Sequence, residues 1–292
     1  MTTKIEWTQE TWNPVTGCTP VSAGCAHCYA RRMAKRLAGR FGYPADDPFR
    51  VTLHEDKLEQ PLRWRKPSRV FVCSMGDLFH EDVPFEFIAQ VWEVMYSCPL
   101  HTFQVLTKRP ARMAEFLSQF EFSPPEMLDN GLWMHAPTER YYGGEGDWPI
   151  SNIWLGVTAE NRRTADERIP ILLDIQAAVR FVSIEPMLEV VDLQHIHLPY
   201  DMSFDSLAKT TVCGSGDCRE LVAINWVIVG GETGPGARPM HPDWARQVRD
   251  QCVEAGVPFF FKKMGTANGN SRLLDGQLWE QYPSSDNFHT GR

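Results

Sequence analysis

The sequence has no run of apolar residues that reaches the roughly 18 residues of a membrane-spanning helix. Its first residues lack the apolar core of a secretory signal. It also has no internal repeat at the period of a solenoid and no low-complexity tract. These absences exclude repeat arrays as a class, and we expect a cytoplasmic protein without a membrane partner.

The sequence has no excess of basic charge, since 29 Lys and Arg stand against 37 Asp and Glu and the formal net charge is −8. A protein that coats nucleic acid through its overall charge is therefore excluded. A local basic patch is compatible with the sequence, because cations gather in two groups: Arg31, Arg32, Lys35, Arg36 and Arg40, and Arg63, Arg65, Lys66 and Arg69. Each group is typical either of a solvated helix face or of a clamp on the backbone of nucleic acid.

Three of the eight cysteines, Cys18, Cys25 and Cys28, fall within eleven residues. Without an export signal we expect a reducing environment, where clustered cysteines bind metals more often than they form disulfides. A closed structural zinc site needs four ligands, whereas an iron–sulfur cluster held by three cysteines keeps one iron open. We therefore predict that these three cysteines bind an open iron–sulfur cluster.

Two alternatives to the cluster stay open at this point. A zinc site would need a fourth ligand, either His27 inside the cysteine run or the distant Cys213 and Cys218. Buried, inert thiols are the second alternative. For Cys213 and Cys218 themselves we predict a flexible loop that carries two thiols, because two ligands alone do not make a metal site.

Short apolar runs alternate with helix-like segments along most of the chain. The predicted strands are 69–73, 102–106, 152–157, 179–184, 224–229 and 257–261, and the predicted helices are 29–37, 84–96, 110–117, 164–175 and 242–255. Alternation of this kind predicts right-handed βαβ units and a parallel sheet. The expected fold is therefore α/β, a partial TIM-like barrel of about seven parallel strands with outer helices.

Two stretches interrupt the alternation and read as insertions in loops. They lie at about 118–150 and 193–222, within a single barrel domain that we place at residues 1–270. Residues 271–292 are expected to form a loosely packed C-terminal tail.

Polar side chains follow each predicted strand at the point where it ends. These residues are Ser74 and Asp77, Lys108 and Arg109, Thr158 and Glu160, Ser183 and Glu185, Glu232, and Lys262 and Lys263. The carboxyl ends of parallel strands meet at one face, which is the usual location of an active site. We therefore predict a functional ring at this face, although ordinary solvated loops would show a similar composition.

The cysteine run resembles that of the radical S-adenosylmethionine superfamily, with Cys-x6-Cys-x2-Cys in place of the usual Cys-x3-Cys-x2-Cys. More narrowly, most of the chain resembles a phage- and prophage-associated family of radical-SAM-like proteins. The segments that carry this resemblance are Trp12-Asn-Pro, Ser74-Met-Gly-Asp-Leu-Phe-His80, Leu106-Thr-Lys-Arg-Pro110, Leu155-Gly-Val-Thr, Ser183-Ile-Glu-Pro-Met187, Val229-Gly-Gly-Glu-Thr-Gly234 and Phe260-Phe-Lys-Lys-Met-Gly265.

The resemblance implies a [4Fe–4S] cluster on Cys18, Cys25 and Cys28, with S-adenosylmethionine chelated at the fourth iron. It implies an electron donor such as flavodoxin or ferredoxin. One electron then cleaves the sulfonium and yields a 5′-deoxyadenosyl radical, which abstracts hydrogen from a substrate. The resemblance implies that this substrate is a nucleic acid or nucleotide.

The resemblance also implies roles for the residues at the strand ends. By chain order, the segment Ser74 to Asp77 corresponds to the motif that binds the amino group of the methionine moiety, with Asp77 as the amine contact. Lys108 or Arg109 is a candidate for the carboxylate of that moiety. The remaining candidates could contact ribose, adenine or substrate: Tyr29, Thr158, Ser183, Glu185 and Glu232. Alternative roles stay open, namely a helix cap for Asp77 and a core aromatic for Tyr29.

Two rival functions remain compatible with the sequence. One is a nucleic-acid-binding protein that carries zinc or a cluster and has no catalytic activity. The other is a barrel hydrolase without radical chemistry, which would use the carboxylates of Asp77, Glu185 and Glu232.

Overall fold

The computed structural model describes residues 3–119, 149–198, 202–214 and 217–283. For residues 210, 212–214 and 217–221 only the backbone is described. The predicted insertion at about 118–150 therefore lies almost entirely outside the described residues. So do the side chains of Cys213 and Cys218.

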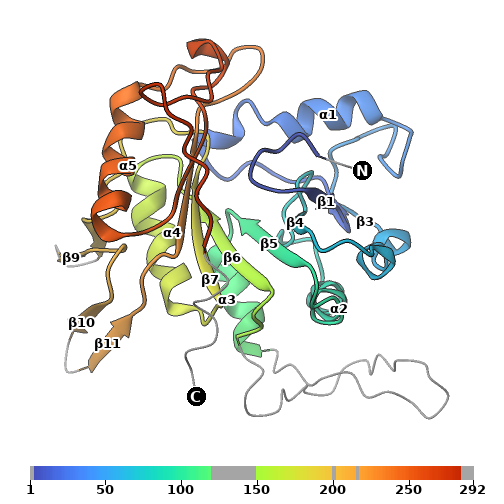
Figure 1. Cartoon of the computed structure of the whole chain (residues 1–292). Helices are drawn as coiled ribbons and strands as arrows, with labels where there is room; N and C mark the ends of the chain where they lie inside the picture. Colours follow the sequence, from blue (N-terminus) through green and yellow to red (C-terminus); the bar gives the residue numbers. More distant parts are fainter. Residues whose placement is uncertain (1–2, 120–148, 199–201, 215–216, 284–292) are drawn as a thin grey trace.

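The centre of the fold is a seven-stranded sheet in the order β1-β4-β5-β6-β7-β12-β13 (Figure 1). Its strands are β1 (Glu10–Trp12), β4 (Arg69–Val72), β5 (Thr102–Thr107), β6 (Ile153–Thr158), β7 (Val179–Ile184), β12 (Trp226–Gly230) and β13 (Phe259–Lys263). All neighbouring strands are parallel, and the order of the strands across the sheet is the same as their order along the chain. This winding is that of a barrel. Because no pairing joins β1 to β13 in the described residues, the sheet is a curled half-barrel, and the predicted α/β partial barrel is confirmed.

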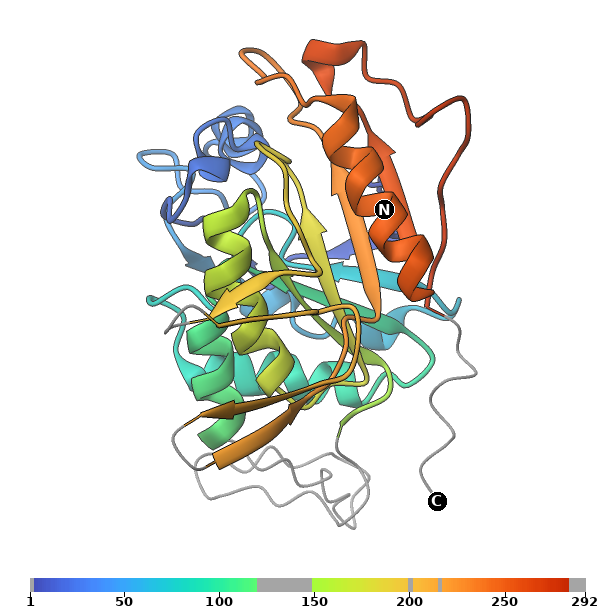
Figure 2. The ribbon, with the colours of Figure 1, turned by 90° about the vertical axis from the view of Figure 1, so that its left-hand side faces the viewer.

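Five helices accompany the sheet: α1 (Tyr29–Leu37), α2 (Phe85–Tyr96), α3 (Pro110–Gln119), α4 (Arg162–Asp174) and α5 (Pro242–Ala255). Local sequence sets the ends of two of them. The Asn161 side chain caps α4 in a reciprocal pair with Thr164. Helix α5 begins with Pro242 and stops at Gly256, whose φ of 68° suits glycine. Figure 2 shows α3, α4 and α5 on one side of the sheet, as outer helices of a half-barrel.

Alternation along the strands separates two apolar layers. On β12, Val227 and Val229 belong to the large core beneath the helices, whereas Trp226 and Ile228 belong to a smaller cluster on the concave face. We call this second set the inner cluster: Trp7, Trp154, Val179, Phe181, Trp226, Ile228 and Phe260. A Cβ atom at Gly156 would lie 2.5 Å from the Phe181 ring, so this glycine makes room for the inner aromatics. The aromatic residues thus fill the concave side of the sheet.

The predicted insertion at 193–222 forms two short antiparallel hairpins. One pairs β8 (Ile196–Leu198) with β9 (Met202–Phe204), and the other pairs β10 (Thr210–Gly214) with β11 (Asp217–Leu221). Within the described part of the chain, no helix is long and apolar enough to span a bilayer.

The predicted C-terminal tail, residues 271–292, is described as far as residue 283, and part of it pairs with the sheet. The Phe261 amide donates to the Trp279 carbonyl at 2.8 Å, and the Gln281 amide donates to the Phe259 carbonyl. The Trp279 ring also lies 5.9 Å from the Phe259 ring. This segment therefore covers the free edge of β13. Such pairing has no local sequence signal, because it depends on the backbone of a sheet edge that is distant along the chain.

Candidate functional site

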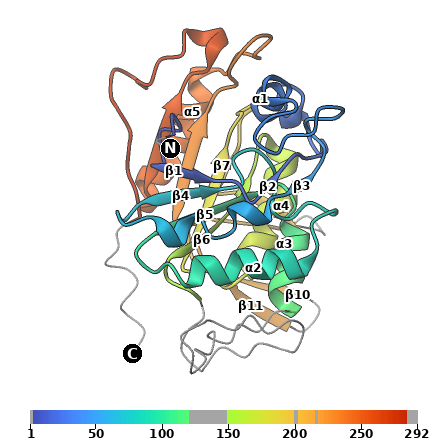
Figure 3. The ribbon, with the colours of Figure 1, turned by 90° about the vertical axis from the view of Figure 1, so that its right-hand side faces the viewer.

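The cysteine loop, residues 17–28, lies at the end of the half-barrel where the strands terminate. The Gly17 amide donates to the Met75 carbonyl just beyond β4, and Gly17 also forms a parallel bridge with Gly76. In Figure 3, α1 and the loops after β12 and β13 lie at this same end, while the β10–β11 hairpin lies at the opposite end. We call this end the mouth.

The three clustered cysteines differ from the other described cysteines in exposure. Cys18, Cys25 and Cys28 are free and half-buried, whereas Cys73, Cys98 and Cys252 are buried in the core. Cys28 immediately precedes α1, and Cys25 ends a single 3₁₀ turn, Ala23–Cys25. Three free, partly exposed thiols therefore lie on one loop at the mouth.

A buried carboxylate, Glu160 after β6, anchors one side of the cysteine loop. Its Oε1 accepts from Ser22 Oγ and from Lys108 Nζ, both at 2.6 Å, and its Oε2 accepts from Arg168 Nη1 at 3.0 Å. Its side chain is fully buried. Burial alone would raise the pKa of this carboxyl, but Lys108 and Arg168 outweigh burial and hold the pKa at about 2.

The loop packs directly on Glu160. A Cβ atom at Gly24 would lie 2.5 Å from Glu160 Oε1, so only glycine fits at this point of the loop. The sequence predicts Glu160 at a strand end but does not predict a role for it. Its position two residues beyond β6 is the sequence signal for this role, because the ends of parallel strands lie on the same face as the predicted cysteine loop.

A second carboxylate, Glu232 after β12, anchors the other side of the loop. Arg238 donates to it from Nε at 2.9 Å and from the backbone amide at 2.8 Å, and His27 Nδ1 lies 2.9 Å from its Oε2. Burial would raise the pKa of this carboxyl, but the hydrogen bonds from Arg238 and His27 lower it to about 2. Arg238 also donates from Nη2 to the Ala23 carbonyl at 3.0 Å. Arg238 Nη2 also donates to Glu232 Oε1 at 2.5 Å, so both oxygens of Glu232 have partners and the carboxylate positions the loop.

The carboxylate of Asp77 also accepts hydrogen bonds at both of its oxygens. Its Oδ1 accepts from Thr107 Oγ1 at 2.8 Å and from the Phe79 amide at 3.0 Å. Its Oδ2 accepts from the Lys108 amide at 3.2 Å and from Arg109 Nη1 at 3.3 Å. Since all its acceptor positions are filled and it is buried, this geometry argues against the predicted amine contact and favours a structural role.

Arg109 connects this network to the first cysteine. Its Nη1 lies 3.3 Å from Cys18 Sγ, and its Nη2 donates to the Thr19 carbonyl at 3.2 Å. Burial, with the charge of Asp77, raises the pKa of the Cys18 thiol to about 11, although Arg109 opposes this. A metal that binds this sulfur would therefore displace a proton.

The other predicted residues divide into two groups. Tyr29 is exposed and donates from its hydroxyl to the Ser74 carbonyl at 3.0 Å. Glu185 accepts a hydrogen bond from Lys262 Nζ at 2.5 Å. Burial raises the pKa of the Tyr29 hydroxyl, and the charges of Lys262 and Glu185 make smaller contributions of opposite sign. By contrast, Thr158 and Ser183 are register neighbours on β6 and β7, and both are buried. The structure thus brings Tyr29, Ser74 and Glu185 together at the mouth.

The hydrolase alternative needs a free carboxylate at the mouth. Asp77 is paired with Arg109, Glu185 with Lys262, and Glu232 with Arg238. A carboxylate held this way is a poor general base, because the cation stabilises its ionised form. The geometry therefore does not favour this alternative.

In the described residues, no group of three or more His, Cys, Asp or Glu side chains is arranged to hold a single metal ion. A [4Fe–4S] cluster sets a different requirement, since each cysteine binds a different iron and the sulfur atoms stand further apart. Three free thiols on one loop meet the donor chemistry of such a cluster.

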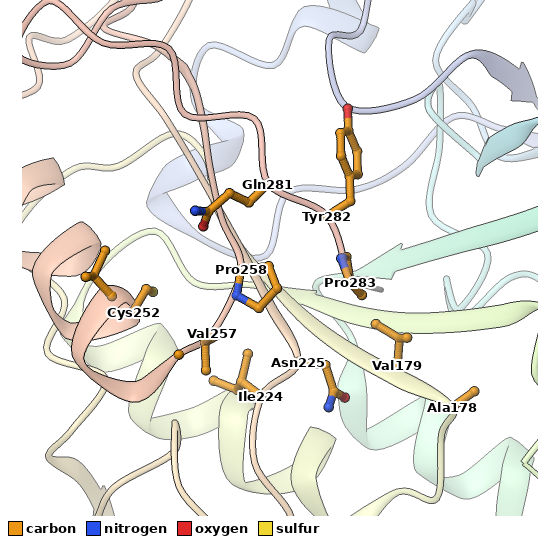
Figure 4. Close-up of a pocket in the computed structure, with 12 residues that line it drawn as sticks. Ala178, Val179, Ile224, Asn225, Cys252, Val257, Pro258, Gln281, Tyr282 and Pro283 are labelled. Atoms are coloured by element: carbon orange, nitrogen blue, oxygen red, sulfur yellow. The ribbon is translucent and has the colours of Figure 1, made fainter. Parts of the chain in front are cut away.

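Two pockets of about 630 Å³ lie at different ends of the molecule. Figure 4 shows the first, lined by Val179, Asn225, Pro258 and Tyr282 among others, where β7, β12 and β13 begin. This end of a parallel barrel usually serves stability. The second pocket includes Cys18 and lies at the mouth, so only the second belongs to the candidate site.

Comparison with known proteins gives one match. No curated protein and no solved structure matches the chain. A family described as "Protein of unknown function (DUF5131)" matches residues 2–283, which is nearly the whole sequence. The chain with the half-barrel and the anchored cysteine loop therefore belongs to the DUF5131 family.

Proposed function

We propose that this protein is a radical S-adenosylmethionine enzyme whose [4Fe–4S] cluster is held by Cys18, Cys25 and Cys28. The observation that carries the proposal is the placement of three free, half-buried thiols on one loop at the mouth of a parallel half-barrel. When bound, the cluster would supply the electron that cleaves the sulfonium of S-adenosylmethionine and releases a 5′-deoxyadenosyl radical.

The protein residues have separate tasks in this proposal. Glu160 and Glu232 hold the cysteine loop from opposite sides through Ser22 and His27. The inner cluster fills the concave side of the sheet below the mouth and limits the entry of water there. Tyr29 and the Glu185–Lys262 pair offer an aromatic ring and fixed charges to a bound cofactor or substrate at the mouth.

Anaerobic reconstitution with iron and sulfide tests the proposal. We expect about four iron and four sulfide per chain, and cleavage of S-adenosylmethionine to 5′-deoxyadenosine after reduction by dithionite. Cys18→Ala, Cys25→Ala and Cys28→Ala should each abolish this cleavage. Cys98→Ala is the matched control, because Cys98 is buried in the core near the end of α2 and should leave cleavage unchanged.

Two outcomes would contradict the proposal. Full turnover in Cys18→Ala would mean that another ligand completes the cluster and that the long first gap has been misread. A colourless protein that takes up one zinc per chain and binds nucleic acid without cleaving S-adenosylmethionine would support the non-catalytic alternative instead.

A further inference from the structure

We propose that the exposed face of α1, together with Phe41, binds single-stranded nucleic acid and leads it to the mouth. The surface consists of Arg31, Lys35, Arg36, Arg40 and Phe41, and we call it the α1 surface. The proposal deepens the proposed function by naming a substrate class, and it rests on that function only for the chemistry performed at the mouth.

The charge of the α1 surface contrasts with that of the whole chain. The chain has a net charge of −8, yet residues 29–40 contain five cations and no Asp or Glu. Among the described residues, no ion pair involves any of these five cations. Arg32 turns toward the loop after β12 and donates to the Thr233 carbonyl at 2.8 Å, while Arg31, Lys35, Arg36 and Arg40 are exposed.

This charge pattern works against the helix when nothing is bound. Arg31 and Lys35, like Arg32 and Arg36, are like charges four residues apart, which destabilises a helix. Arg31 and Arg32 also lie in the first turn, where the helix dipole disfavours cations. No side chain caps this end. A polyanion bound to this face would offset the repulsion between these cations, which is a physical reason for expecting one as the partner.

The cations border a recess and not a flat face. The pocket beside Cys18 has a volume of about 630 Å³ and is lined by Arg31, Lys35, Phe49 and Arg50. The Arg31 guanidinium lies 5.3 Å from the centre of the Phe49 ring. Asp46, Asp47 and Asp82 also line this pocket, and Asp46 is paired with Arg50. The α1 surface therefore continues into the candidate site.

Exposed aromatic rings at both ends of α1 distinguish a nucleic acid from other anions. The Phe41 side chain is 72% exposed, and its φ of 54° is a strained value for a bulky residue. Tyr29 is 43% exposed at the other end, beside the mouth. Unpaired bases stack on such rings while cations hold the phosphates, whereas the bases of a duplex are already stacked. This combination favours a single strand over an acidic protein.

Fluorescence anisotropy with a labelled oligothymidylate of about 16 nucleotides tests the proposal over a series of salt concentrations. The triple variant Arg31→Gln/Lys35→Gln/Arg36→Gln should bind at least about tenfold more weakly. Its slope of log affinity against log salt should be shallower by about 2, because each lost phosphate contact removes about 0.7. Phe41→Ala should bind about tenfold more weakly with an unchanged slope, since stacking does not release counterions.

The matched control is Arg63→Gln/Arg65→Gln/Lys66→Gln, which removes three exposed cations that precede β4, at the end opposite the mouth. Its affinity and salt slope should equal those of the unaltered protein. The binding measurements use cluster-free protein, so their result does not depend on whether S-adenosylmethionine is cleaved.

Equal losses in the two triple variants would overturn the proposal, because binding would then follow net charge alone. Equal affinity for a duplex, with no effect of Phe41→Ala, would overturn the assignment of a single strand. If the α1 variant binds the oligonucleotide normally but slows reduction of the cluster by an acidic electron-transfer protein, the surface belongs to that protein instead.

Discussion

Replacement of Glu160 by Gln removes the charge that joins the cysteine loop to the sheet. Ser22, Lys108 and Arg168 all donate to this carboxylate, whose side chain is fully buried. The variant leaves two cations facing a neutral amide, and removal of one partner from a buried ion pair costs about 3–5 kcal/mol. The pKa gives a similar magnitude, since a fall from 4.5 to about 2 corresponds to about 3 kcal/mol. We expect Glu160→Gln to lower the free energy of unfolding by about this amount.

The pH dependence of this stability has a defined sign. Because the folded pKa lies below the unfolded value of 4.5, the contribution of Glu160 is present above pH 4.5 and is lost as pH falls toward about 2. The Gln variant should lack this part of the acid dependence and keep the part due to Glu232, whose pKa is also about 2. Urea unfolding of the cluster-free protein between pH 3 and pH 7 measures both effects.

A matched control separates the anchor from a general loss of charge. Glu167 lies on α4 and pairs with Arg163 at the surface, where both side chains are more than half exposed. Glu167→Gln should change the free energy of unfolding by less than about 0.5 kcal/mol. If Glu160→Gln unfolds like this control and takes up iron like the unaltered protein, Glu160 does not anchor the loop and the reasoning is refuted.

Two further predictions concern the inner cluster and the second anchor. Gly156→Ala should lower the free energy of unfolding by about 1–3 kcal/mol, because its Cβ would lie 2.5 Å from the Phe181 ring; an unchanged urea midpoint would show that the ring can move aside. Arg238→Gln should reduce iron uptake on reconstitution and raise the pKa of Glu232, because the carboxylate loses its main hydrogen-bond donor. Uptake equal to that of the unaltered protein would show that Glu160 alone is sufficient to hold the loop.

Much of the architecture could be predicted from short-range patterns. The six apolar runs predicted as strands all form strands of the parallel sheet, because burial on both faces requires near-continuous apolar sequence. The first strand, β1, is only three residues long and is not among these six runs. The closing edge could not be predicted, because the segment around Trp279 is stabilised by backbone pairing with β13 and not by a pattern of its own.

The candidate site could be predicted in its composition but not in its assignments. The three cysteines and the polar residues at the strand ends do gather at the mouth. The hydrogen-bond partners of the carboxylates could not be predicted, because they are distant along the chain. Ser22 is 138 residues from Glu160, and His27 is 205 residues from Glu232. Asp77 was predicted to contact the amine because three of its four donors, on Thr107, Lys108 and Arg109, reach it only when the ends of β4 and β5 lie side by side.

The sequence by itself determined which segments form strands and helices and which thiols are grouped, since these depend on periodicity and on neighbours a few residues apart. Only the tertiary structure decided which charges are free and which are occupied. A carboxylate such as Glu160 acquires its low pKa and its anchoring role from cations on other elements, and Coulomb attraction depends on distance in space and not on separation along the chain.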